Sequence, residues 1–130
     1  MDAKTTAIEI ARLADEKQAE DIVVIDTSRL SSVADWLVIC GADSERQVKA
    51  VTDNIVDGLK KKGLTPIGVE GVAGGRWALL DYADVVVHVF HRPVRSYFDL
   101  EGLWADAPRL DVDLDSGGAG GGEAGGEGAG

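Results

Sequence analysis

Residues 77–90 have the sequence WALLDYADVVVHVF, and this stretch decides the fold of the chain. Two apolar runs, 77–82 and 85–90, are separated by only two residues, which predicts two strands joined as an antiparallel hairpin. Successive side chains of a strand point to opposite faces of a sheet. Val85, Val87 and Val89 therefore share one face of the second strand, and an all-valine face is typical of a core.

The opposite face of the same hairpin combines large apolar and ionisable side chains. Parity places six residues there: Trp77, Leu79, Asp81, Val86, His88 and Phe90. Because burying ionisable groups is costly, we expect this face to be the open one. Apolar groups on an open face indicate a partner-binding surface, with Trp77 as the main anchor. In the competing interpretation, a loop or a second subunit merely covers these side chains.

Helices and strands alternate in the sequence that precedes the hairpin. A helical stripe predicts a helix from residue 3 to about residue 18, formed by Ala7, Ile10, Ala11 and Ala14. Apolar runs at 22–25 and 36–40 predict two strands. Ser44 begins the longest helix, since its oxygen can accept from the backbone of Gln47 and the Gln47 side chain can return a bond. Gly63 suits the end of that helix.

The remaining elements complete a small α/β fold. A short strand is predicted at 66–69, and a final helix follows Pro93, with Tyr97, Leu100, Leu103 and Trp104 at helical spacing. The order is helix, two strands, helix, three strands, helix. It predicts a two-layer sandwich with a mixed five-stranded sheet and helices mainly on one face.

Charge and composition separate a folded unit from a tail. The formal net charge is −10, from 13 basic and 23 acidic residues, and residues 111–130 contribute −5 of it. No basic stripe for direct, sequence-specific nucleic-acid binding is present. Residues 117–130 contain only Gly, Ala and Glu. These residues have almost no apolar side chain whose burial could offset the backbone entropy lost on ordering. We expect one domain over 1–112 and a disordered, acidic, Gly-rich tail over 113–130.

The sequence shows no secretion or membrane signal. The first residues, MDAK, lack the basic start and apolar run of a signal peptide, and no apolar run approaches membrane-spanning length. Cys40 is the only cysteine, so neither an intrachain disulfide nor a Cys/His metal spacing exists. We expect a soluble, cytoplasmic protein without membrane contact.

Asp81, Asp84 and His88, with Asp35 as a further candidate, support an enzymatic alternative. Carboxylates at strand ends could hold Mg²⁺ for phosphoryl or nucleotidyl transfer, and the turn at 41–44 before a helix could receive a phosphate. However, no Asp-x-Asp pair lies on a strand after that turn, and no Walker-type Gly-Lys-Ser/Thr exists. Asp81 and Asp84 bracket a tight turn, where aspartate is common. We expect no enzyme activity, metal or cofactor, and keep a metal-dependent nucleotidyltransferase or phosphohydrolase as the alternative.

Motifs spread over residues 5 to 105 resemble a known family. They are Asp21-Ile22, Ser31-Ser32 with Asp35, Ser44-x-Arg46 with Val48, Gly63, Pro66, Gly68-Val69-Glu70-Gly71, Trp77, Asp81, Asp84-Val85, Val87-His88-Val89, Arg95, Tyr97, Leu100-Glu101 and Leu103-Trp104. In order and spacing they resemble the Iojap or ribosomal silencing factor family. The chain departs from it at Gly41-Ala42, where the family commonly has Thr-Gly or Ser-Gly.

The resemblance implies a regulatory rather than a catalytic role. Members of that family bind the large ribosomal subunit through its ribosomal protein fourteen and block joining of the small subunit when nutrients are scarce. They are often homodimers, and their fold is like that of a nucleotidyltransferase without known catalysis. For this chain the resemblance implies that the sheet face with Trp77 binds the ribosomal partner. Asp81, His88 and Glu70 are then expected to pair with its basic groups.

Overall fold

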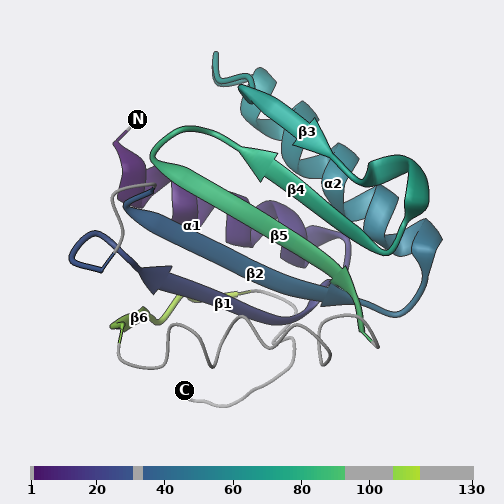
Figure 1. Ribbon diagram of the computed structural model, residues 1–130, viewed down its shortest axis with the longest axis horizontal. Helices are drawn as coiled ribbons and strands as arrows, with labels where there is room; N and C mark the ends of the chain where they lie inside the picture. The colour runs from purple at the N-terminus through teal and green to yellow at the C-terminus, as the bar shows by residue number, and fades with distance from the viewer. Residues whose placement is uncertain (1, 31–33, 93–106, 115–130) are drawn as a thin grey trace.

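The computed structural model describes residues 2–30, 34–92 and 107–114 (Figure 1). Two helices, six strands and one short 3-10 turn occur in these ranges. In chain order they are α1 (Ala3–Glu16), β1 (Glu20–Asp26), β2 (Trp36–Ala42), α2 (Glu45–Lys60), β3 (Gly68–Glu70), η1 (Val72–Gly74), β4 (Trp77–Asp81), β5 (Val85–His91) and β6 (Arg109–Leu110). The predicted final helix after Pro93 lies outside the described residues.

All six strands form one mixed sheet, in the order β3-β4-β5-β2-β1-β6. Only β2 and β5 run parallel, with Trp36 opposite Val85 and Ala42 opposite His91, while the other neighbours are antiparallel. The predicted α/β class and mixed sheet are confirmed. The predicted strand number was wrong, because β6 adds a sixth, two-residue strand that pairs with β1.

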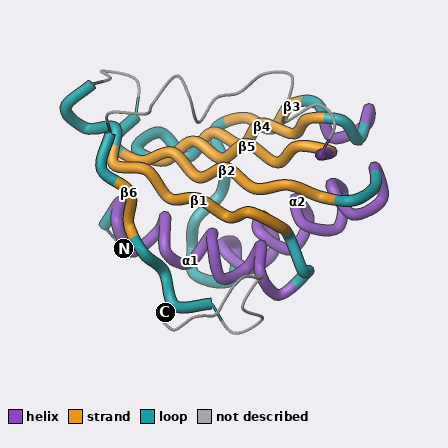
Figure 2. The backbone as a smooth tube through the Cα atoms, turned by 90° about the horizontal axis from the view of Figure 1, so that it is seen from below, coloured by secondary structure: helices purple, strands orange, loops and turns teal. Residues whose placement is uncertain are grey.

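Both described helices pack against the same face of the sheet (Figure 2). The predicted apolar stripe of α1 is fully buried there, and Val48, Val51 and Ile55 of α2 are buried beside it. These side chains meet the sheet residues whose parity directs them to the helices, such as Val38, Leu80 and Val87, each fully buried. This helix-covered face is the aliphatic core of the molecule.

The start of α2 is held by two side chains, as its sequence predicts. Ser44 Oγ accepts from the Gln47 backbone N–H at 3.0 Å. Gln47 Oε1 returns a bond to the backbone N–H of Asp43 at 2.6 Å. Gln47 Nε2 also donates to the carbonyl oxygens of Lys17 and Gln18, at 3.1 and 3.0 Å. The cap therefore also fastens α2 to the turn between α1 and β1.

The segment from α2 to β4 contains three left-handed glycines, Gly63, Gly71 and Gly75. Gly63 follows the helix with φ of +85°, as predicted for its C-terminal residue. The next strand begins at Gly68 rather than at Pro66, although Ile67 N already donates to Asp81 O at 2.7 Å. Gly71 has φ of +82°, and a Cβ there would collide with the backbone carbonyl oxygen of Trp77. The close approach of this loop to the first residue of β4 therefore requires glycine.

The C-terminal part of the described chain packs along the outer edge of β1. Val24 is opposite Leu110, and Leu110, Val112 and Leu114 lie against the helix-side core. Leu114 is two residues beyond the expected domain end at 112. Residues 115–130 lie outside the described ranges, so the disordered tail stays a prediction.

Candidate partner-binding face

The sheet face turned away from the helices carries all seven residues selected from the sequence. Its cross-strand pairs are Trp77–Phe90, Leu79–His88, Asp81–Val86 and Glu70–Leu79. Residues directly opposite each other on neighbouring strands point to the same side of a sheet. We call this set, Glu70, Trp77, Leu79, Asp81, Val86, His88 and Phe90, the Trp77 face. The parity argument for the hairpin is confirmed, since Ala78, Leu80, Val85, Val87 and Val89 are buried on the other side.

Burial changes across this face, and one expectation was wrong. Phe90 is only 1% exposed and belongs to a second buried cluster with Ile25, Leu37, Ile39 and Ala107. Phe90 therefore packs beneath Trp77 and Val86 and does not itself lie on the surface. Trp77, Leu79, Asp81, Val86 and His88 are half-buried, and Glu70 is exposed. The face is thus accessible over β3, β4 and part of β5, while the β1–β2 part is closed.

Three aromatic rings pack together on the Trp77 face, those of the half-buried Trp77 and His88 and that of the buried Phe90. Trp77 lies 5.8 Å from His88 and 5.2 Å from Phe90 between ring centroids, with interplanar angles of 26° and 22°. His88 and Phe90, two residues apart on β5, are 5.9 Å apart and nearly parallel in orientation at 6°. Offset, nearly parallel rings at these separations attract each other beyond their shared burial. Trp77 is consequently held by two rings of β5.

His88 is an uncharged hydrogen-bond acceptor in this cluster. The Trp77 indole Nε1–H donates to His88 Nδ1 at 3.0 Å. Burial lowers the pKa of His88 to about 4, because desolvation disfavours the charged imidazolium. At neutral pH His88 therefore brings no charge to the face, and its Nδ1 is occupied. The negative charge that could meet a basic partner comes from Asp81 and Glu70.

The aspartates of the enzymatic alternative serve the β4–β5 turn. Asp81 Oδ1 accepts from Ala83 N at 2.8 Å, which stabilises the positive φ of +69° at Ala83. The backbone carbonyl of Asp84 accepts from the backbone N–H of Asp35 at 2.9 Å, so this bond between Asp84 and Asp35 involves neither carboxylate. In the three described ranges, no group of three or more His, Cys, Asp or Glu side chains is placed to hold a metal ion. The turn thus explains Asp81 without catalysis.

The start of α2 does not present an open phosphate cradle either. Its amides at Asp43 and Gln47 are bonded to side chains, and Arg92 Nη1 contacts Glu20 at 2.9 Å and Asp43 at 3.3 Å. The pKa of Glu20 is raised, first by desolvation and then by its neighbour Asp43. An anion would meet two carboxylates at this position, which disfavours phosphate binding.

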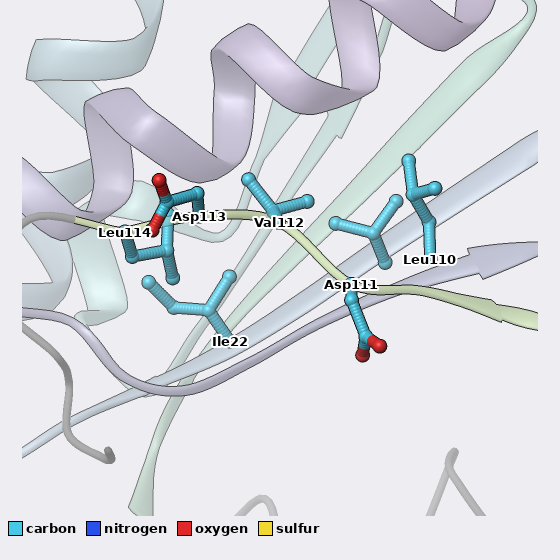
Figure 3. Close-up of a pocket in the computed structure, with 7 residues that line it drawn as sticks. Ile22, Leu110, Asp111, Val112, Asp113 and Leu114 are labelled. Carbon is cyan, nitrogen blue, oxygen red and sulfur yellow. The ribbon is translucent and has the colours of Figure 1, made fainter. Parts of the chain in front are cut away.

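A pocket of about 550 Å³ lies on the other side of the sheet (Figure 3). Ile22 of β1 faces Leu110, Val112 and Leu114 across it, and these side chains also contact the helix-side core. The carboxylates of Asp111 and Asp113 alternate with the apolar side chains along the segment. The polar groups do not converge on one point, so the pocket is separate from the Trp77 face in place and in chemistry.

The hydrogen bond between Trp77 and His88 was not predicted from the sequence. A signal for it existed, since the two-residue turn fixes the hairpin register and puts Trp77 diagonal to His88. Aromatic side chains reach such diagonal neighbours. What the sequence could not show was the burial that keeps His88 neutral.

Comparison with known proteins identifies the family. Residues 1–123 match the family described as "Ribosomal silencing factor during starvation". The chain belongs to this family. The ribosomal silencing factor of Bacillus subtilis is 45% identical over 104 residues, covering 80% of this chain and 88% of that protein. The chloroplastic Iojap protein of Arabidopsis thaliana is 30% identical over 106 residues, covering 82% of this chain and 44% of the plant protein.

Two solved structures have the same fold. A crystal structure of a Chromobacterium violaceum protein superposes with a TM-score of 0.79 at 33% identity, covering 88% of this chain and 95% of that chain. A second crystal structure, of a protein from Bacillus halodurans, superposes with a TM-score of 0.71 at 34% identity, covering 84% of this chain and 96% of that chain. The family description and the name of the Bacillus subtilis relative both refer to silencing of the ribosome. Among the described residues, no helix is long and apolar enough to span a membrane.

Proposed function

We propose that this protein binds the large ribosomal subunit through its ribosomal protein fourteen and sterically blocks joining of the small subunit, which represses translation under nutrient limitation. Membership of the ribosomal silencing factor family supports the ribosome as the target. The observation that carries the proposed contact is the half-buried Trp77, held on a sheet face that neither described helix covers.

The chemistry of the Trp77 face suits a basic protein partner. Trp77, Leu79 and Val86 supply apolar area, while Asp81 and Glu70 supply negative charge at its side. Tryptophan anchors at the centre of interfaces contribute about 2 kcal/mol or more, and carboxylates beside them favour partners with Lys or Arg. The net charge of −10 opposes direct binding to bare RNA and favours a basic ribosomal protein.

The proposed mechanism is exclusion by a bound body, without a chemical step. The helix layer lies on the opposite side of the sheet from the Trp77 face. When that face is bound, the helices project away from the large subunit. A body of 13.6 kDa fixed at the joining surface then occupies space that the small subunit needs.

Co-sedimentation with purified large subunits tests the contact. Trp77→Ala is expected to weaken binding by about 30-fold or more, which corresponds to about 2 kcal/mol. Trp36→Ala is the matched control, because Trp36 is also a half-buried strand tryptophan but packs against the helix-side core. Equal binding by Trp77→Ala and wild type would remove Trp77 from the contact.

We further propose that the protein forms a homodimer, in line with the family resemblance. Two occupants then compete for the Trp77 face: a second copy or the ribosomal protein. Light scattering on wild type and Trp77→Ala separates them. A dimer that dissociates in Trp77→Ala places this face in the dimer interface, whereas an unchanged dimer with lost subunit binding assigns the face to the ribosome alone.

A further inference from the structure

Among the described residues, the indole of Trp77 makes three contacts with two side chains of the neighbouring strand β5. Its ring stacks at 5.2 Å on Phe90, which is 1% exposed and packed in the second buried cluster. Its other neighbour, His88, stacks at 5.8 Å and also accepts the indole N–H at 3.0 Å. A stack alone leaves a ring free to slide or flip in its plane, whereas a directional N–H···N bond selects one orientation.

We propose that His88 is the positioning residue of the Trp77 face: its Nδ1 takes the indole N–H, so that a partner meets the ring of Trp77 and not its hydrogen-bond donor. This inference rests on the proposed function, because it assumes that Trp77 is the anchor. It assigns His88 a role other than the ionic contact expected from the sequence.

The proton inventory of the pair supports this assignment. An indole nitrogen can only donate, so His88 Nδ1 must be the acceptor and the imidazole proton must reside on Nε2. Protonation at Nδ1 would put two donors face to face and break the bond. Burial lowers the pKa of His88 to about 4, which keeps the acceptor available over the whole neutral range.

Positioning has a direct consequence for affinity. A side chain that is already ordered before binding loses less rotamer freedom on docking than a mobile one. A tryptophan whose N–H is satisfied internally also demands no matching acceptor from the partner. The Trp77 face should therefore favour an apolar or cationic side chain packed on the indole, since cations are attracted to the face of an aromatic ring.

The hydrogen bond itself can be observed in the wild-type chain by NMR. In ¹⁵N-labelled protein, long-range ¹H–¹⁵N correlation of the imidazole is expected to show His88 protonated at Nε2. A scalar coupling between Trp77 Nε1 and His88 Nδ1 is expected across the bond. The Trp77 indole signal is assigned by its loss in Trp77→Phe. Protonation of His88 at Nδ1, or no coupling in a well-resolved signal, would overturn the proposal before any variant of His88 is made.

Two His88 variants then separate the acceptor from the ring. His88→Asn keeps an acceptor close to the Nδ1 position but has no ring, whereas His88→Phe keeps a ring but has no acceptor. In His88→Phe the indole N–H should exchange faster and large-subunit binding should weaken by about fivefold, the equivalent of one ordinary hydrogen bond. His88→Asn should keep a protected indole N–H and bind within about twofold of wild type.

The outcomes distinguish this inference from the function on which it rests. If Trp77→Ala binds large subunits like wild type, the proposed contact is wrong. If Trp77→Ala loses binding while His88→Phe keeps the protected indole signal and full affinity, only the positioning role is wrong. Equal losses in His88→Asn and His88→Phe would show that the histidine ring matters for packing alone and would also overturn the proposal. Thermal unfolding of each variant verifies that the fold is retained.

Discussion

The two faces of the sheet differ in the kind of side chain and in how completely it is buried. Toward the helices, Val38, Leu80 and Val87 are fully buried among aliphatic groups. On the other side, Trp77 and His88 are half-buried, aromatic and joined by a hydrogen bond. Both sets come from the same sheet. Under the proposed function, strand alternation separates two tasks, with stability on the helix-covered face and recognition on the Trp77 face.

Adjacent leucines of β4 give the sharpest contrast between the faces. Leu80 is fully buried against the helices, and Leu79 is half-buried on the Trp77 face. Leu80→Ala should lower the free energy of unfolding by about 2–5 kcal/mol, as expected when a core leucine is truncated. Leu79→Ala should cost less than half of that but weaken binding to large subunits. Urea unfolding and co-sedimentation of both variants measure the two effects, and equal destabilisation would contradict the division of tasks.

Gly71 lies in the loop before β4, the strand that carries Trp77 on one face and Leu80 on the other. Gly71→Ala would force a left-handed alanine and push its Cβ into the carbonyl of Trp77, at a total cost of about 3 kcal/mol. Gly63→Ala is the matched control, since Gly63 also has positive φ, but apart from its two chain neighbours no described atom lies within 4 Å of the place that an alanine Cβ would take. Its cost should be only the backbone part, about 1–2 kcal/mol. Chemical unfolding distinguishes them, and similar losses would show that the close approach to Trp77 is unimportant.

Acid should destabilise the Trp77 face through His88. The pKa of His88 is about 4 in the fold, against about 6.5 in an unfolded chain, so the unfolded chain takes up the proton first as the pH falls. The contribution of neutral His88 is complete above about pH 6.5 and is lost progressively toward pH 4. Between about pH 7.5 and about pH 5, wild type should lose about 2 kcal/mol more than His88→Phe.

Wild type and His88→Phe share the carboxylates and His91. Comparing the two proteins at both pH values therefore cancels the contribution of these groups to the pH dependence of stability. Unfolding by urea at each pH provides the numbers. A loss of stability that is the same in wild type and His88→Phe would show that His88 is not held neutral by burial.

Tyr82 is the exception on the helix-covered face, and its removal should have the smallest effect. Its hydroxyl is buried without a hydrogen-bond partner among the described residues, and burial raises its pKa to about 12. Tyr82→Phe deletes this unsatisfied group and should raise the free energy of unfolding by about 1 kcal/mol. A decrease in thermal stability would instead show that the hydroxyl contributes to the fold.

Local sequence predicted the hairpin and its two faces because a two-residue turn leaves little freedom of register. The bond from Tyr82 N to Val85 O closes this turn, and the facing of the strand residues on either side then follows by alternation. Glu70 could be placed opposite Leu79 only once β3 was known to pair with β4. For the hairpin itself, alternation alone assigned Trp77, Leu79, Asp81, Val86, His88 and Phe90 correctly to one face of the sheet.

Features that depend on distant segments could not be predicted in this way. Strand β6 has two residues, too few for a pattern, and exists because it pairs with β1. Phe90 was expected near the surface, but Ile25, Leu37 and Ala107 close around it from other elements. Its burial, like the lowered pKa of His88, results from packing that no local pattern contains.

Subunit joining tests the central claim most directly. Light scattering follows assembly of purified large and small ribosomal subunits in the presence of wild type, Trp77→Ala or Trp36→Ala. Wild type and Trp36→Ala are expected to slow or prevent joining, and Trp77→Ala is not. Inhibition by Trp77→Ala at the same concentration as wild type would show that the protein acts on the ribosome through another surface, and would contradict the separation of stability and recognition across the sheet.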